Sequence, residues 1–108
     1  MRLHFYYPFW YLWLLGSVHL HMEEYEKAVE ALKMVVVREP DRIVGHQGLA
    51  IAYIRLGRGE QARSEVAEVL RLFPEYSLEV YREHYHGRDT DPALIESDIE
   101  ALREAGLK

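Results

Sequence analysis

The sequence predicts an all-α protein in which two helical hairpins stack as a right-handed α-solenoid, followed by a short helix and a C-terminal capping helix. The first observation is an internal repeat, because the stretch from Tyr25 to Pro40 recurs in weaker form from Gly59 to Pro74, 34 residues later and without a gap. The second observation is that apolar residues recur at the three- and four-residue spacing of a helix face. The third is that each copy contains a small residue and closes on a proline. Such a period is typical of paired helices that stack around one continuous core.

The matched positions identify the residues expected to hold the two repeats together. The identical pairs are Leu15/Leu49, Glu26/Glu60, Ala28/Ala62, Val35/Val69 and Pro40/Pro74, and the pairs of similar size are Gly16/Ala50, Leu32/Val66 and Val36/Leu70. Two helices approach closely only where a side chain is small, so Ala28 and Ala62 are expected at the closest contact of each hairpin. The packing residues of the repeats are therefore expected to be Leu15, Gly16, Ala28, Leu49, Ala50, Ala62, Pro40 and Pro74.

The first repeat is expected to span about residues 8–41. Its first helix, about 8–21, begins at Pro8, where the missing N–H has no cost. This helix is apolar on every side, which predicts that both of its faces are covered. The second helix, about 24–39, places Ala28, Leu32 and Val35 on one face.

The second repeat is expected to span about residues 42–75. Its helices are predicted at about 42–56 and 60–73. Asp41 is positioned to cap the first of them through its carboxylate. Gly57 is expected to end that helix in a left-handed conformation.

The C-terminal segment, 76–108, does not continue the repeat, because Glu83 and His84 would fall where Leu49 and Ala50 are buried. Instead, Ser77 can cap a short helix over about 78–84, and Asp91 with Pro92 can open a helix that runs to about residue 105. We expect this last helix to cap the array by covering the apolar face of the fourth helix, at Val66, Val69 and Leu70. Residues 1–108 are thus interpreted as one domain.

Composition excludes several classes of function. The chain has no cysteine, so it forms no disulfide, and this agrees with a cytoplasmic location. The net charge is −5 with scattered basic residues, so we expect no nucleic-acid partner. The apolar stretch from Phe5 to Leu20 is too short and too interrupted to span a membrane. Its register with the second repeat favours a repeat helix over a secretion signal.

No catalytic, metal or cofactor site is expected. His19 with His21 and His84 with His86 are two residues apart, whereas zinc pairs on a helix lie four apart; convergence of His84 and His86 at a helix end is the weaker alternative. The segment from Asp89 to Asp91 lacks the glycine and glutamate of a calcium loop. The serines at positions 17, 64, 77 and 97 lack the context of a nucleophile.

Residues 8–74 resemble two tetratricopeptide repeats. The resemblance is carried by Leu15, Gly16, Tyr25, Ala28, Pro40, Leu49, Ala50, Tyr53, Leu56, Gly57, Ala62 and Pro74. Two positions depart from the pattern: His19 stands where an aromatic residue is usual, and Gly59 is the counterpart of Tyr25.

The C-terminal part carries a second resemblance. The segments 73–78, 85–91 and 102–107 are similar to the end of repeat regions fused to bacterial class III adenylate cyclases and winged-helix transcription regulators. The chain has no cyclase or winged-helix signature, so neither activity is expected. The resemblance implies either a C-terminal fragment of such a protein or a stand-alone relative.

The resemblance implies a non-enzymatic scaffold that binds a peptide, a protein partner or its own copy. In such repeats the first helix of each hairpin lines the concave face. The residues expected there are Trp10, Trp13, Ser17, His21, Val44, Gln47, Ile51, Ile54 and Arg55. The alternatives are that the chain is a detached regulatory tail, and that its tryptophans pack against a further repeat. Because one partner helix covers about half of another, Trp10, Trp13 and Leu14 are expected to be exposed and available for a homodimer.

Overall fold

The computed structural model describes residues 8–85 and 91–108, and all of its regular structure in these residues is α-helical. The helices are α1 (Phe9–His21), α2 (Tyr25–Arg38), α3 (Ile43–Arg55), α4 (Gly59–Leu72), α5 (Leu78–Tyr85) and α6 (Pro92–Glu104). Each begins and ends within one residue of its predicted position. The all-α prediction of two hairpins, a short helix and a C-terminal helix is confirmed.

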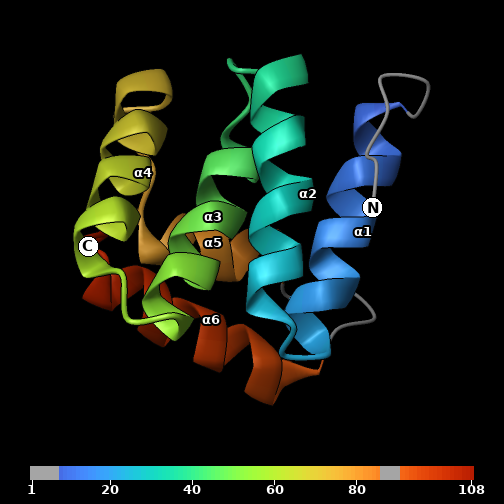
Figure 1. Cartoon of the computed structure of the whole chain (residues 1–108). Helices are drawn as coiled ribbons and strands as arrows, with labels where there is room; N and C mark the ends of the chain where they lie inside the picture. The colour runs from blue at the N-terminus through green and yellow to red at the C-terminus, as the bar shows by residue number, and fades with distance from the viewer. Residues whose placement is uncertain (1–7, 86–90) are drawn as a thin grey trace.

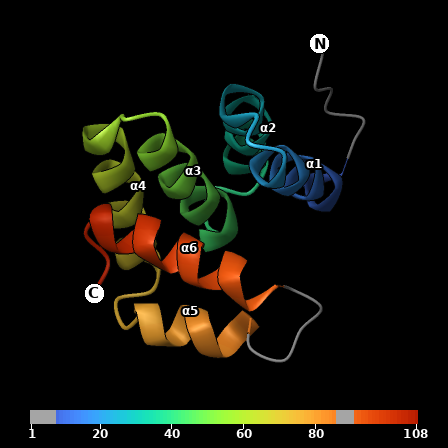
Figure 2. The ribbon, with the colours of Figure 1, turned by 90° about the horizontal axis from the view of Figure 1, so that it is seen from below.

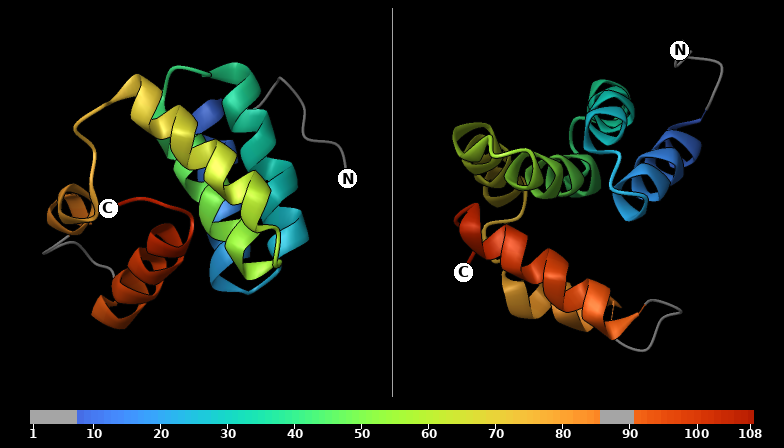
Figure 3. Two further views of the ribbon diagram at one scale, coloured as in Figure 1. Left: turned by 90° about the vertical axis from the view of Figure 1, so that its left-hand side faces the viewer. Right: turned by 60° about the horizontal axis from the view of Figure 1, so that its bottom comes forward.

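The helices form two packed layers. Helices α1 and α2 pair as one hairpin and α3 and α4 as the next, with α2 packed against α3 between them (Figure 1). Helices α5 and α6 lie together on one side of this row, and α6 packs on α3 (Figures 2 and 3). The C-terminal segment therefore adds a second layer to the solenoid.

Glycines and capping side chains set two of the helix ends and two of the helix starts. Gly57 has a φ of 76°, the left-handed conformation predicted for the end of α3, and Gly106 ends α6 in the same way with a φ of 104°. The Ser77 Oγ accepts a hydrogen bond from the Val80 N–H, and the Asp91 carboxylate accepts one from the Ala93 N–H. The predicted caps of α5 and α6 are thus confirmed.

The predicted cap of α3 is wrong. Arg42, rather than Asp41, occupies the capping position, and no side chain accepts a hydrogen bond from the first turn. Asp41 lies one residue too early, because only the residue directly before the helix directs its side chain at those N–H groups. Arg42 instead donates from Nε to Glu39 Oε1, over 3.1 Å.

The residues predicted to pack the two repeats differ in how far they are buried. Ala28 and Ala62 are fully buried, and Leu32, Val35, Val66 and Val69 on the same helix faces are buried as well. Gly16, Leu49 and Ala50 are also buried, Leu15 is half-buried, and Pro40 and Pro74 are exposed just beyond the ends of α2 and α4. A Cβ atom on Gly16 would lie 2.7 Å from Leu32 Cγ, and one on Gly48 would lie 2.9 Å from Leu32 Cδ1. The Leu32 side chain therefore fills the space between α1 and α3 only because both glycines leave it open.

The expectation that the last helix covers α4 is wrong. The main neighbours of α6 are α3 and α5, and Val66 and Val69 are buried although α6 packs elsewhere, since α4 packs along α3. The apolar stripe of α6, at Ile95, Ile99 and Leu102, is buried in the second layer.

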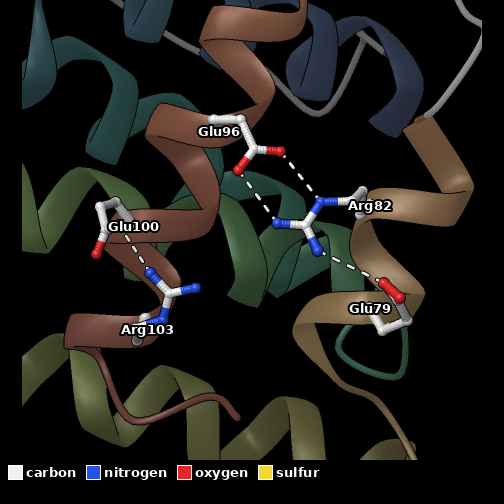
Figure 4. Close-up of polar contacts among 5 residues, drawn as sticks. All are labelled: Glu79, Arg82, Glu96, Glu100 and Arg103. Carbon is white, nitrogen blue, oxygen red and sulfur yellow. Dashed lines mark hydrogen bonds and ion pairs between the residues drawn. The ribbon is translucent and has the colours of Figure 1, made fainter.

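Polar contacts join the two helices of this second layer. The Arg82 guanidinium of α5 donates to both carboxylate oxygens of Glu96 on α6, over 3.0 and 3.1 Å, and also reaches Glu79 (Figure 4). The hydrogen bond from Arg82 lowers the pKa of Glu96. Arg103 pairs with Glu100 within α6 at 2.7 Å. These pairs are exposed, so their main effect is to orient α5 and α6 rather than to stabilise them strongly.

Candidate partner-binding pocket

A pocket of about 450 Å³ opens between α1 and α3, with α5 and α6 on its other side. It collects seven of the nine residues predicted for the concave face. These are Trp13, Ser17, His21, Val44, Gln47, Ile51 and Arg55. The first helices of both repeats contribute to it, as the repeat pattern predicts.

The other two predicted residues lie outside the pocket. Trp10 is 57% exposed, and Ile54 is half-buried against the core. Trp10 belongs to an exposed apolar stripe on α1 that also includes Tyr11, Leu14 and Val18. Trp13, which was expected to be exposed, is half-buried against the core, because its position on the helix faces α3 and the second layer rather than solvent.

Sequence reasoning missed the part of the pocket that the C-terminal helices provide. Tyr81 and Tyr85 of α5, and Leu94, Ile95, Ser97 and Asp98 of α6, line the same space. Glu23, in the turn between α1 and α2, and Tyr25, the first residue of α2, also line it. The apolar stripe of α6 predicts a buried face but does not say which surface buries it.

Gln47 connects the concave face to the C-terminal segment. Its side chain is 6% exposed, and its Oε1 accepts a short hydrogen bond from the Tyr76 hydroxyl. Its Nε2 donates to the Tyr85 hydroxyl over 3.4 Å. Burial raises the pKa of the Tyr76 hydroxyl above its ordinary value. Gln47, expected to meet a partner, thus uses its amide within the chain.

Arg55 makes a second connection from α3 to α6. Its Nη2 donates to the backbone oxygen and the hydroxyl of Ser97 and lies 4.0 Å from Asp98 Oδ1. The other Asp98 oxygen accepts a hydrogen bond from the Tyr81 hydroxyl over 3.2 Å. Burial raises the pKa of the Asp98 carboxyl, and the contacts with Tyr81 and Arg55 oppose that rise. The pocket therefore has a desolvated carboxylate in its wall.

Two of the histidines in the described residues lie against carboxylates of the same chain. His19 Nδ1 lies 2.8 Å from Glu24 Oε1, and His46 Nδ1 lies 2.7 Å from Glu65 Oε1. Within residues 8–85 and 91–108, no group of three or more metal-ligating side chains converges. The candidate pair of His84 and His86, and the segment from Asp89 to Asp91, fall partly outside the described residues.

Comparison with known proteins identifies the repeats. A sequence model of the tetratricopeptide repeat family matches residues 19–81, more than half of the chain. A search of curated proteins finds no match. In the described part of the chain, no helix has both the length and the apolar character needed to cross a membrane.

Proposed function

The chain belongs to the tetratricopeptide repeat family, and on that premise we propose that it is a non-enzymatic scaffold that binds a protein or peptide through its concave face. Repeats of this family generally mediate protein–protein interaction. The proposal assigns partner binding to the pocket between α1, α3 and the C-terminal helices. It takes the chain as one domain with repeats at about 8–41 and 42–75 and a C-terminal cap at 76–108.

The observation that supports this proposal best is the convergence of residues from both repeats on one pocket. Its volume of about 450 Å³ lies within the range of roughly 300–1,000 Å³ that is usual for binding pockets. Its lining includes Trp13 and several tyrosines, the residue types that most often anchor a partner.

Site-specific crosslinking tests this assignment. A photoreactive amino acid at His21, an exposed residue of the pocket, should crosslink to a partner in cells. The same amino acid at Ser64, an exposed residue of α4 outside the pocket, serves as the control. Equal yields of one adduct at both positions would place the partner elsewhere.

We also propose self-association through α1 as a second mode of binding, and the exposed apolar stripe of that helix supports it. The stripe at Trp10, Tyr11, Leu14 and Val18 is uncharged and exposed. A second copy could cover it with the same stripe, since a two-fold axis pairs like surfaces. A homodimer would leave the concave face open to a different partner.

The regulatory-tail alternative rests on the sequence of residues 70–107 alone. If this alternative is correct, a coding region for a cyclase or a winged-helix domain should lie directly upstream of the one for this chain. Sequencing the genomic neighbourhood tests it directly.

A further inference from the structure

The pocket on the concave face is too enclosed for an extended peptide that follows the whole groove. Helix α6 packs on α3, the helix that would line the groove in the second repeat. The hydrogen bonds from Arg55 to Ser97 and from Gln47 to Tyr85 join the same surfaces. What stays open is the space beside α1, which can accept inserted side chains.

Four aromatic side chains are part of the lining of this space. Trp13, Tyr25, Tyr81 and Tyr85 come from three different helices. Aromatic rings attract cations through their electron-rich faces while they also provide apolar surface. A lining of this kind suits a positively charged group that is attached to an apolar chain.

The charges around the pocket favour the same ligand. Glu23 and Asp98 are its two carboxylates, and Arg55 is the one guanidinium or ammonium group among the described lining residues. Arg55 is already engaged with Ser97 and Asp98. The Glu23 carboxylate, by contrast, makes no hydrogen bond or ion pair with any described residue; only the Glu23 backbone N–H is bonded, to the Leu20 carbonyl oxygen. The net charge of −5 adds a long-range attraction for cations.

The backbone at Glu23 is strained in a way that the second repeat avoids. Glu23 has φ 60°, and the residue 34 positions later, Gly57, has φ 76° in the equivalent turn. Glycine adopts this left-handed conformation freely, whereas a residue with a Cβ does so at a cost. A strained non-glycine residue at the rim of a pocket suggests that its side chain has a function.

We propose that this pocket binds the basic side chain of a partner peptide flanked by apolar residues, with Glu23 as the carboxylate that selects the positive charge. The proposal rests on the function proposed above and names the chemistry of its partner. The apolar flanks contact the aromatic lining, and the basic group lies near Glu23 and Asp98.

Three short peptides test the proposal. They are acetylated and amidated, have leucine on both sides of the central residue, and carry lysine, norleucine or glutamate at the centre. The indole N–H signal of Trp13 in the NMR spectrum of the whole chain reports binding in the pocket. The signal of Trp10, which lies outside the pocket, is the internal control. The lysine peptide should shift the Trp13 signal, leave the Trp10 signal in place and bind more tightly than either of the others.

Variants at Glu23 separate charge selection from folding. Glu23→Gln should weaken binding of the lysine peptide about two- to fivefold, as expected for a partly exposed charge pair, and leave the norleucine peptide unchanged. Glu23→Gly should raise the melting temperature while weakening binding in the same way. Glu104→Gln removes an equal charge from the exposed end of α6 and should change neither quantity.

The possible failures are distinguishable. Equal binding of the lysine and norleucine peptides at Trp13 would overturn charge selection but leave the concave face as a binding site. Butylamine has the ammonium group without the flanking leucines. If it bound as tightly as the lysine peptide, a peptide would be excluded as the ligand. Failure of all three peptides to shift the Trp13 signal at millimolar concentration would overturn the pocket's assignment, whereas crosslinking at His21 tests the scaffold function independently.

Discussion

Single small side chains set how closely the helices of each hairpin approach. Ala28 and Ala62 are fully buried at equivalent positions, and α1 and α3 approach Leu32 only where glycines stand. Protein interiors are close-packed, so an added methylene group has no room there. The volume of each of these residues is therefore as important as its apolar character.

Enlarging either alanine should destabilise the fold. Ala28→Leu and Ala62→Leu are each expected to lower the free energy of unfolding by about 1–3 kcal/mol, because the larger side chain must displace the facing helix. Chemical denaturation measures the change, with Ala67→Leu on the exposed face of α4 as the control. If the free energy of unfolding of both variants equalled that of the parent, the predicted repeat register would be wrong.

His46 joins the turn after α2 to both helices of the second hairpin. Its Nδ1 lies 2.7 Å from Glu65 Oε1 and its Nε2 lies 3.2 Å from the Pro40 carbonyl oxygen. His46→Leu should cost about 1–3 kcal/mol, since it leaves a half-buried carboxylate without its partner. A double-mutant cycle with Glu65→Leu measures the coupling. Additive effects of the two substitutions would contradict a direct interaction.

The half-buried carboxyl of Asp98 should make stability depend on pH. Its pKa in the folded chain is raised by burial above the ordinary value of 3.8, so the folded state holds this proton more tightly than the unfolded state. The stabilising contribution is present below the ordinary pKa and is lost as the pH rises through the folded pKa. Asp98→Asn should therefore gain stability relative to the parent as the pH rises across that interval. Parallel curves of unfolding free energy against pH would contradict this assignment.

At the scale of elements, the helices could be predicted from sequence almost completely. Pro40, Pro74, Gly57 and Gly106 determine helix ends through local backbone geometry, which a single sequence displays directly. The prediction that Asp41 caps α3 was wrong for a local reason as well. The helix starts one residue later than that cap requires, and the start decides which side chain lies next to the first turn.

The position of the C-terminal layer could not be predicted from local patterns. The stripe of α6 specifies a buried face, but its burial against α3 depends on which surfaces are left uncovered after the hairpins form. The pocket was therefore predicted on its α1 and α3 side, while Tyr81, Tyr85 and Asp98 were missed. Gln47 and Arg55 were placed on the correct face, but their contacts within the chain follow from tertiary docking.

Removing α6 should uncover the concave side of α3. Deletion of residues 92–108 is expected to expose Ile51 and Tyr81, which are both buried in the whole chain, and to produce aggregation or a loss of helix beyond the deleted segment. Circular dichroism and light scattering measure the two effects. A monomeric truncation with all of its remaining helix content would show that α6 is dispensable for folding.

At the scale of the whole molecule, the exposed large hydrophobic residues of the described segments gather on α1 and at its C-terminal end. Trp10, Tyr11, Leu14, Val18 and Met22 lie there, between 38% and 62% exposed. Together they offer roughly 500 Å² per copy, so a symmetric pair would bury about 1,000 Å², near the lower limit for specific interfaces. A patch of this size is unusual on the surface of a monomer.

Dimerisation through α1 should respond to charge placed on that face. In sedimentation over a concentration series, the parent chain should form dimers, and the double variant Trp10→Glu, Leu14→Lys should remain monomeric. Val37→Lys alters an equally apolar residue that is 72% exposed on α2, and it should not change the assembly. A parent chain that stays monomeric at the highest concentration would contradict the homodimer.

The docking of the C-terminal layer on α3 also has a consequence for the order in which the chain folds. Each hairpin forms between sequence neighbours, whereas the bonds from Gln47 to Tyr85 and from Arg55 to Ser97 join residues 38 and 42 positions apart. Contacts at such separations form later, because a longer loop must first be closed. In stopped-flow refolding, we expect the helical signal to recover before the emission of Trp13 does. During synthesis, the concave face of α3 would then stay open to chaperones until residues 76–108 have left the ribosome, so the pocket is the last part of the molecule to mature.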